Sequence, residues 1–403
     1  MIRQFIGFQS PKIKSLKLLY SLIRKLGPIK VSTLTEMTGY KHTTCVRLLD
    51  ELVQEGLIYD SGLGVSSGGR RPAMYVINPT TFYLIGVEIT NLFTTVLLLD
   101  LNLTIVESKK LKMSNASTGE YTLNFVTKSV SELLDQNKIN KEQLLGIGIG
   151  VLDPIDQEKG VIKSGSFLAD GWDDLNIVRQ LEEANNCPVL LNNGTNLAAL
   201  AEYRLNFSKE NESIVFVSSD MGIRCGIIQQ GKLISNKNEM DDAFGHMIVD
   251  IHGKLCSCGS YGCLQAYSSL PAIREEVIKR VKRGEISSLM CEVNDVENIS
   301  YHQILEALEK EDPLCLEVIK KAANYFGIGL TNLIYIVRPD IVICGGTLVP
   351  KPLFFDVACE TAQGRLKSYP NSPVQIIKSS TAYNIVAQGA GCIVFDHFTE
   401  ETM

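Results

Sequence analysis

Residues 246–265 read HMIVDIHGKLCSCGSYGCLQ and bring together one histidine and three of the eleven cysteines of this 403-residue chain. Imidazole nitrogen and thiolate sulfur are common zinc ligands, and four of them make a closed tetrahedral site with no position left for a reactive water. Such a site is structural, because it stabilises a loop that has little apolar core of its own. The predicted ligands are His246, Cys256, Cys258 and Cys263.

The fourth ligand has an alternative in His252, which lies closer to the cysteines in sequence. Gly259 and Gly262 flank the turn between the last two cysteines, and glycine permits the tight backbone that such a turn needs. Free thiols beside a histidine are the competing interpretation, but the ligand number and spacing favour zinc. The remaining cysteines are most simply buried apolar residues.

Composition indicates a globular protein with two or three domains, since hydrophobic residues make up 45% and charged residues 21% of the 403 positions. No stretch is apolar over the length that spans a bilayer, and the N-terminus lacks the features of a secretion signal. Irregularly spaced cysteines are typical of a reducing compartment. We therefore expect a cytoplasmic protein with no membrane partner.

The charge is distributed unevenly along the chain. Residues 1–80 contain eleven Lys and Arg against five Asp and Glu, although the net charge of the whole chain is −6. A small basic module joined to a large acidic body indicates that only the first part binds a polyanion.

The first 60 residues predict three helices. Leucine and isoleucine recur at helical spacing from Leu16 to Leu26, and Gly27-Pro28 ends the pattern. A short second helix is predicted after Ser32 as N-cap, with Leu34 and Met37 facing inward and Gly39 at its end. The third helix follows at once in KHTTCVRLLDELVQEGLI (residues 41–58), with an apolar face formed by Cys45, Leu48, Leu49 and Leu52. Two helices joined by a tight glycine turn after a supporting helix are the parts of a helix-turn-helix.

The exposed side of the third helix carries side chains that donate hydrogen bonds to phosphates and base edges. The next stretch, LIYDSGLGVSSGGRRPAMYVI (residues 57–77), predicts a β-hairpin wing whose two arginines suit a narrow minor groove. A three-helix module that docks onto protein is the alternative, and the basic charge, turn and wing together favour DNA. The DNA-binding candidates are Lys41, His42, Thr43, Thr44, Arg47, Arg70 and Arg71.

The rest of the chain alternates strands and helices, which predicts an α/β architecture. Residues 82–102 (FYLIGVEITNLFTTVLLLDLN) are interpreted as two strands that meet at a polar turn. Further strands are expected in LLGIGIGVLDPID, PVLLNN and IYIVRPDIVICGGTLVP, which start at residues 144, 188 and 334.

Several ordered motifs resemble the ROK family of repressors, open reading frames and sugar kinases. They include GHMIVDIHGKLCSCGSYGCLQAYSS (245–269), GIGIGVLDPID (146–156), Gly171-Trp172, NLAALAE (196–202) and IVICGG (341–346). TGYKHTTCVRLLDELVQEGLI and GGRRPAMYVINP (from residues 38 and 68) resemble the DNA-binding half found in the repressors.

The resemblance implies a winged helix-turn-helix over 1–80 and a two-lobed, actin-like (ribonuclease H-like) domain. The first lobe would span 81–195 and be completed by a C-terminal helix at about 384–403, and the second would span 196–383 with the zinc loop. The family's regulators bind operator DNA as oligomers and respond to a sugar or sugar phosphate. By that resemblance a ligand in the cleft changes the angle between the lobes and the spacing of the DNA-binding modules.

The kinase motifs of the family are altered here. Its Asp-x-Gly-Gly-Thr phosphate loop corresponds to residues 88–92 (EITNL), where both glycines carry side chains. Its second glycine loop corresponds to residues 219–228 (SDMGIRCGII), where Arg224 replaces a glycine. Its catalytic Asp corresponds to Gly194, which has no side chain to act as a base. We therefore expect that the chain is not a kinase.

The sugar site implied by the resemblance is also altered, because Ala243 and Gln265 stand where the family has glutamates. Asn193, His246 and Gln265 can still hydrogen-bond hydroxyl groups, although neutral acceptors bind more weakly than carboxylates. The site then binds its effector weakly, prefers a different or anionic ligand, or has lost ligand control.

We predict a zinc-stabilised transcriptional regulator, a repressor of carbohydrate genes, that binds palindromic operator DNA as a homodimer or homotetramer. The alternatives are an ATP-dependent sugar kinase with an added DNA-binding domain, and a DNA-binding regulator that responds to no effector.

Overall fold

The computed structural model describes residues 1–6, 10–62, 73–114, 116–152, 154–163, 168, 171–172, 175–207, 213–234, 243–292, 295–368, 374–379 and 384–399. The chain forms two compact units, Met1–Lys209 with Asn384–Met403, and Glu210–Tyr383. The sequence led us to end the first lobe at residue 195, but α6 (Gly194–Glu202) belongs to the first unit, where it packs against α13 (Ile385–Thr399). No described helix is both long and apolar enough to cross a membrane.

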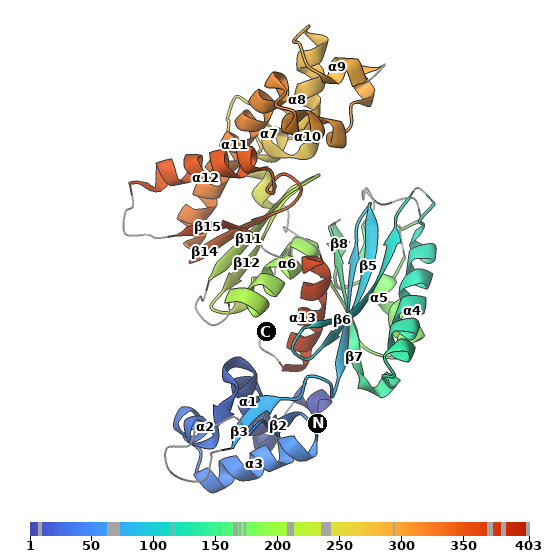
Figure 1. The fold of residues 1–403 in the computed structure, drawn as a ribbon, viewed down its shortest axis with the longest axis vertical. Coiled ribbons are helices and arrows are strands. Elements are labelled where there is room, and N and C mark those ends of the chain that lie inside the picture. Colours follow the sequence, from blue (N-terminus) through green and yellow to red (C-terminus); the bar gives the residue numbers. More distant parts are fainter. Residues whose placement is uncertain are drawn as a thin grey trace. The chain divides into compact units, whose positions relative to one another are not determined.

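The N-terminal module consists of three helices and a small antiparallel sheet (Figure 1). The apolar faces predicted for the first and third helices are confirmed by Leu16, Leu19, Cys45 and Leu49, which are buried in its core. The helices are α1 (Pro11–Leu26), α2 (Val31–Thr38) and α3 (His42–Gln54). The strands are β1 (Ile29–Lys30), β2 (Ile58–Asp60) and β3 (Met74–Ile77), in the order β1-β3-β2.

The second helix differs from its predicted form. Lys30 is the N-cap residue of α2, so Ser32 lies inside the helix instead of capping it. Leu34 is buried as predicted, but Met37 is 52% exposed. Helix α2 packs against α3 and β1, and these neighbours cover the part of its face on which Leu34 lies but leave Met37, three residues later, exposed. Gly39 ends α2 in the left-handed conformation with φ of 70°, as predicted.

The predicted hairpin is confirmed in its two strands, which pair antiparallel from Ile58↔Ile77 to Asp60↔Tyr75. Asp60 Oδ1 accepts hydrogen bonds from the backbone N–H of Gly62 and of Met74, at 3.0 and 3.2 Å, and so closes the described end of the hairpin. Residues 63–72, which include Arg70 and Arg71, lie outside the described residues.

The first residues of the chain fasten the N-terminal module to the rest of the first unit. The short helix η1 (Ile2–Phe5) buries both of its end residues completely. Lys17 Nζ, from α1, donates to the carbonyl oxygen of Phe5 at 3.0 Å. Arg3 Nη2 donates to the carbonyl oxygens of Glu142 and Leu144, each at 2.9 Å.

The main sheet of the first unit has the order β10-β7-β4-β5-β6, in which β4, β5 and β6 are antiparallel and β4, β7 and β10 are parallel. Helices α4 and α5 cover one face, and α13 and α6 lie on the other (Figure 1). The remaining elements are β4 (Tyr83–Ile89), β5 (Phe93–Asp100), β6 (Ile105–Lys112), α4 (Gly119–Gln136), η2 (Lys141–Gln143), β7 (Leu144–Val151), β8 (Ile155–Asp156), β9 (Val161–Ile162), α5 (Ile177–Asn185), β10 (Val189–Asn193) and η3 (Tyr203–Phe207).

Glycines in the sheet let α13 approach it at backbone distance. A Cβ on Gly86 of β4 would lie 1.9 Å from the carbonyl oxygen of Ala387, and one on Gly148 of β7 would lie 1.8 Å from that of Ala390. Any side chain at either position would push α13 off the sheet, which explains the alternation of glycine and isoleucine in residues 146–150.

The sheet of the second unit repeats this topology in the order β13-β12-β11-β14-β15, with β11, β12 and β13 antiparallel and β11, β14 and β15 parallel. The predicted α/β architecture is therefore confirmed in both units. The elements are β11 (Ile214–Ser219), β12 (Ile223–Gln229), β13 (Lys232–Leu233), η4 (Ala243–His246), α7 (Gln265–Ser268), α8 (Leu270–Lys282), α9 (Leu289–Glu292), η5 (Val296–Asn298), α10 (Tyr301–Glu309), α11 (Pro313–Val337), β14 (Ile341–Gly345), α12 (Pro352–Leu366) and β15 (Gln375–Lys378).

Candidate functional site

The outer face of α3 displays the side chains that the sequence proposes for DNA contact. Lys41, His42, Thr43 and Arg47 are exposed, whereas Thr44 is half-buried. The N-terminus of α3 has no side-chain cap, so its first N–H groups remain available to an anion. Asp50 is also exposed on this face, one turn after Arg47. Asp50 was not predicted from the sequence, although its spacing of three residues from Arg47 places both side chains on the same face of the helix.

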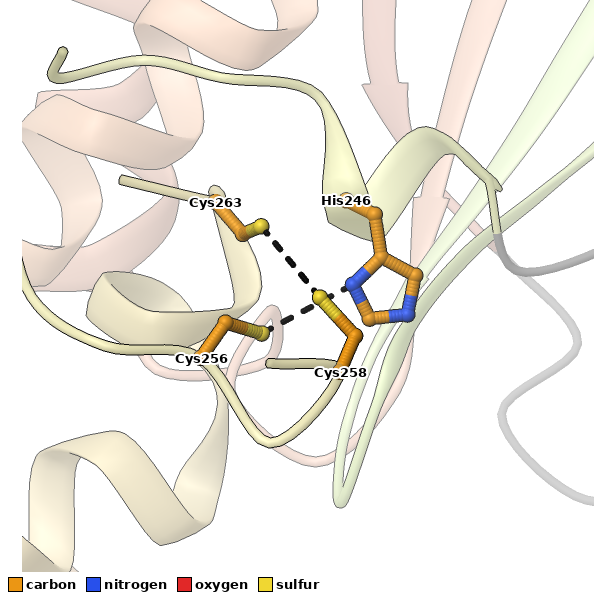
Figure 2. A group of neighbouring side chains, drawn as sticks. All are labelled: His246, Cys256, Cys258 and Cys263. Carbon is orange, nitrogen blue, oxygen red and sulfur yellow. Dashed lines mark hydrogen bonds between the residues drawn. The ribbon is translucent and has the colours of Figure 1, made fainter. Parts of the chain in front are cut away.

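The four predicted metal ligands lie together at the end of η4 and in the loop before α7 (Figure 2). Their ligand atoms are all within 4.8 Å of one another. Cys256 Sγ is 3.7 Å from His246 Nδ1, and Cys258 Sγ is 3.7 Å from Cys263 Sγ. Zn–S bonds of about 2.3 Å and Zn–N bonds of about 2.0 Å place tetrahedral ligands about 3.5–3.8 Å apart, so the four residues fit this ion.

His252, the alternative ligand, does not belong to this group. Its side chain is exposed, and its backbone N–H donates to Asp250 Oδ1 at 3.1 Å. The turn around the thiols depends on Gly262, which has φ of 77° and where a Cβ would lie 1.7 Å from the carbonyl oxygen of Asp250. The loop folds back on Asp250. This fold holds the backbone of His252 at Asp250, outside the group of ligands, and requires glycine at position 262.

The thiols differ in how readily they ionise. Burial, followed by hydrogen bonding to the two other thiols, raises the pKa of Cys263 to about 12. The backbone N–H of Ser260 lowers the pKa of the exposed Cys258. A bound cation is what would offset the burial of Cys263 and hold all three sulfurs as thiolates.

A polar cluster anchors the loop between His246 and Gln265, called the metal loop below because it carries the three candidate cysteine ligands, to the helices of the second unit. Tyr267 Oη donates to Asp250 Oδ2 at 3.0 Å and accepts from the Lys254 backbone N–H at 2.7 Å. The Lys254 ammonium is 2.6 Å from Glu276 Oε2 of α8. Burial alone would raise the pKa of Glu276, but the hydrogen bond and charge of Lys254 outweigh it and lower that pKa. No sequence motif indicates this cluster, because its members lie up to 26 residues apart.

The turn from β4 to β5, where the resemblance implies a phosphate loop, is closed by its own side chain. Thr90 Oγ1 accepts hydrogen bonds from the backbone N–H of Leu92 and of Phe93, at 3.3 and 3.0 Å, and donates to the Phe93 carbonyl oxygen at 2.8 Å. An anion would have to displace Thr90 to reach these N–H groups.

The turn after β14 is closed in the same manner by a carboxylate. Asp220 Oδ1 accepts from the backbone N–H and the hydroxyl of Thr347, at 2.7 and 2.5 Å. Its other oxygen accepts from Ser218 Oγ at 2.7 Å. Gly346 has φ of 94°, and a Cβ there would lie 2.7 Å from Asp220 Oδ2. The Asp220 carboxylate thus occupies donors that a phosphate would otherwise use.

Asn193 and Gly194 begin α6 in the first unit. Asn193 is buried and caps the helix, because its Oδ1 accepts from the Thr195 backbone N–H at 2.9 Å. A Cβ on Gly194 would lie 2.8 Å from Leu152 Cδ2, so an acidic side chain there would require Leu152 to move.

Gln265, the third residue proposed for sugar contact, begins α7 in the second unit. Its Oε1 accepts from the Ile223 backbone N–H at 3.3 Å and so joins the metal loop to β12. His246 also lies in the second unit, with its Nδ1 turned to the thiols.

Comparison with known proteins gives consistent results. The model of the ROK family matches residues 84–397. The xylose repressor of Bacillus subtilis is 28% identical over 385 residues, which are 95% of either chain. The DNA-binding transcriptional dual regulator NagC of Escherichia coli is 25% identical over 332 residues, which are 82% of this chain and 79% of NagC.

Solved structures share the fold. A ROK family transcriptional regulator, a homologue of the E. coli MLC protein, superposes with a TM-score of 0.79 at 21% identity and covers 96% of each chain. A ROK hexokinase from Thermus thermophilus superposes with a TM-score of 0.66 at 22% identity, over 77% of this chain and 97% of its own. The hexokinase therefore shares most of its length with this chain, while the regulator matches nearly all of both.

Proposed function

Because the chain belongs to the ROK family, we propose that it is a DNA-binding repressor of carbohydrate genes, whose affinity for DNA is controlled by a carbohydrate effector. The observation that carries the proposal is the N-terminal module, which precedes the matched residues 84–397 and presents the basic, uncapped end of α3 to solvent. The similarity of the B. subtilis xylose repressor over 95% of both chains supports it, since that relative is named for the same activity.

The N-terminal module acts as a winged helix-turn-helix. The first turn of α3 enters the major groove, with Thr43 and Arg47 nearest the base edges, Thr44 beside them, and Lys41 and His42 at the phosphates. The hairpin of β2 and β3 is the wing, and Arg70 and Arg71, which follow β2 and precede β3 in the sequence, are proposed as minor-groove contacts. A two-fold homodimer, or a tetramer built from it, binds a palindromic operator.

The protein is not an enzyme in this proposal. Gly194 offers no base, and Leu152 fills the space beside it. Thr90 and Asp220 occupy N–H groups of the turns where phosphates would bind. The alternative, a sugar kinase with an added DNA-binding module, is supported by the fold shared with the T. thermophilus hexokinase. Sugar-dependent release of ADP from ATP would establish that alternative.

The His246, Cys256, Cys258 and Cys263 group binds Zn²⁺ in this proposal, and the ion fixes the loop in its present fold. Four protein ligands leave no position for a reactive water, so the ion is structural.

Effector contact at Asn193 reaches the DNA-binding module through the first unit. Asn193 caps α6, and α6 packs along α13. Helix α13 in turn contacts η1, and the guanidinium of Arg24 in α1 lies 4.8 Å from the ring centre of Phe395 in α13. A shift of α6 therefore moves α13 and, with it, the base of the N-terminal module.

The deciding experiment is selection of sheared genomic DNA by the purified, zinc-loaded protein, followed by sequencing. We expect enrichment of a palindromic site beside sugar-transport or sugar-processing genes. The variant Arg47→Ala should weaken that binding by about 1–3 kcal/mol and relax selectivity at one position in each half-site. Lys279→Ala, which removes an exposed lysine of α8, is the matched control. Absence of enrichment over bulk DNA at moderate salt would refute the proposal.

A further inference from the structure

Cys258 differs from the other cysteines in its exposure to solvent. Among the cysteine side chains that the structure describes, it alone is exposed, and the others are buried or half-buried. Within the metal loop, Cys256 and Cys263 are only 5% and 1% exposed. Cysteines are oxidised in the order of their accessibility and thiolate character, and a metal ligand is a thiolate. An oxidant in solution therefore reaches Cys258 before any other described thiol.

The backbone around Cys258 leaves room for such an approach. Residues 254–256 and 260–262 form a small hairpin in which Leu255 pairs with Tyr261, and Cys258 lies in its turn. The turn is closed by the backbone N–H of Gly259, which donates to the carbonyl oxygen of Cys256 at 2.9 Å. A Cβ built on Gly259 would meet no described atom within 4 Å. A small oxidant can therefore reach the turn without displacing another described element.

Cys263 is the partner with which an oxidised Cys258 can form a disulfide. The two Sγ atoms are 3.7 Å apart (Figure 2), and a disulfide brings them to about 2.0 Å. Gly259, with φ of 85°, lies in the segment between them and gives its backbone freedom to adjust. Cys256 is separated from Cys258 by a single residue, which leaves little chain to adopt the disulfide geometry.

The metal loop depends on its ligands because little of its apolar surface is buried. Its large apolar side chains that are more than half exposed are Ile248, Ile251, Leu255 and Tyr261. A loop of this kind is held by its metal ion and not by a core of its own. A disulfide between Cys258 and Cys263 would leave two protein ligands, His246 and Cys256, where a closed tetrahedral site needs four.

We propose that Cys258 is an oxidation site for hydroperoxides, at which a disulfide with Cys263 forms and the metal ion is released. Cys258 Sγ attacks a peroxide oxygen and the O–O bond breaks, which gives a sulfenic acid and an alcohol or water. Cys263 Sγ then attacks Cys258 Sγ and displaces the sulfenic oxygen as water. The two thiolates give two electrons to the peroxide, and two protons from solvent complete the products. The proposal goes beyond the control of DNA binding and does not depend on it.

The experiment treats the full-length, zinc-loaded protein with hydrogen peroxide. The absorbance of 4-(2-pyridylazo)resorcinol follows the released zinc, and peptide mass mapping after alkylation identifies the disulfide. We expect zinc and the Cys258–Cys263 disulfide to appear together in equal amounts, and dithiothreitol with added zinc to restore the starting protein. The mass map reads the disulfide whether or not the protein carries zinc, so failure of the metal proposal and failure of the oxidation site are distinguished.

Three variants locate the reaction. Cys258→His keeps a set of four zinc ligands but removes the exposed thiol, so peroxide should release its zinc about ten-fold or more slowly. Cys263→Ser removes the partner thiol, so dimedone should trap the sulfenic acid on Cys258. Cys187→Ser removes a half-buried thiol of the first unit and should release zinc at the rate of the parent protein.

The proposal is overturned if the first disulfide joins other cysteines, or if dimedone labels another thiol before Cys258. Zinc that stays bound after Cys258 is oxidised would also overturn it, as would release from Cys258→His at the rate of the parent protein. If Cys258→His binds no zinc, the order in which thiols of the parent protein are labelled still decides the outcome.

Discussion

Arg204, in the π-helical turn η3 that follows α6, and Asp396 of α13 form a buried ion pair. Arg204 Nη2 is 3.2 Å from Asp396 Oδ1, and the two side chains are 3% and 1% exposed. The second carboxylate oxygen accepts from Nε and Nη2 at 3.4 and 3.3 Å. Arg204→Met removes the cation and leaves the carboxylate in a site closed to water, which costs about 3–5 kcal/mol of unfolding free energy.

The double variant Arg204→Met/Asp396→Leu should recover most of this loss, because no charge is then left buried. A surface cluster, in which Arg280 pairs with both Glu285 and Glu317, provides the control. Arg280 Nη2 is 2.6 Å from Glu317 Oε2, but the two side chains are 21% and 67% exposed. Arg280→Met should therefore cost less than about 1 kcal/mol in spite of the shorter distance.

The measurement is guanidinium unfolding followed by the fluorescence of Trp172, which is the single tryptophan of the chain and is buried in the first unit. The signal therefore reports the unit that contains the pair. Equal, small losses for Arg204→Met and Arg280→Met would refute the reasoning, since they would mean that water reaches Asp396 once its partner is gone.

Three further predictions concern the proposed zinc ligands, the missing catalytic base and the ion pair between Lys254 and Glu276. His246→Ala should abolish stoichiometric zinc and lower the melting temperature, whereas His252→Ala should retain one zinc per chain; equal zinc contents would contradict the ligand assignment. Gly194→Asp should yield no ATP-dependent sugar phosphorylation and should destabilise the first unit by about 1–3 kcal/mol, because Leu152 must move; measurable turnover would show that only the base was missing. The pKa of Glu276 is lowered in the fold, so its stabilisation is complete above the unfolded value of about 4.3 and is lost as the pH falls through the lowered pKa. Glu276→Gln should remove that part of the acid dependence of stability, and an unchanged profile would argue against the ion pair with Lys254.

Local patterns predicted much of the fold because the responsible interactions are local. Gly39 ends α2 where a left-handed residue is needed, and the apolar spacing of α3 matches its buried side. The prediction that Met37 faces inward was wrong, because helical spacing shows which residues share a face but not how much of that face a neighbouring element covers. The predicted end of the first lobe at residue 195 differs from the unit boundary for a related reason. Helix α6 belongs to the first unit because it packs against α13, which lies almost 200 residues later in the sequence.

The residues that could hold a metal were predictable from the sequence, but the hydrogen bonds that close the neighbouring turns were not. The spacing of His246 and the three cysteines was sufficient to find a group that can hold a metal ion, since zinc constrains both residue type and distance. The sequence shows that glycines of the family's phosphate loops are replaced. It does not show which side chains accept hydrogen bonds from the backbone N–H groups of these turns. Thr90 closes its own turn, and Asp220 reaches a turn 127 residues away. Only the folded chain brings that second pair together.

The two sheets share one topology, yet the N-terminal module is fastened to the first, and this difference decides how an effector can act. The backbone of α13 packs directly against the backbone of Gly86 and Gly148. At these two points no flexible side chain lies between the helix and the sheet, so none can adjust if the helix moves. The same helix packs along α6, which starts at Asn193, and reaches η1 and Arg24 of the N-terminal module. A ligand that pulls on the start of α6 therefore acts on a rigid element with two partners, and packed elements of this kind shift between discrete arrangements instead of deforming gradually.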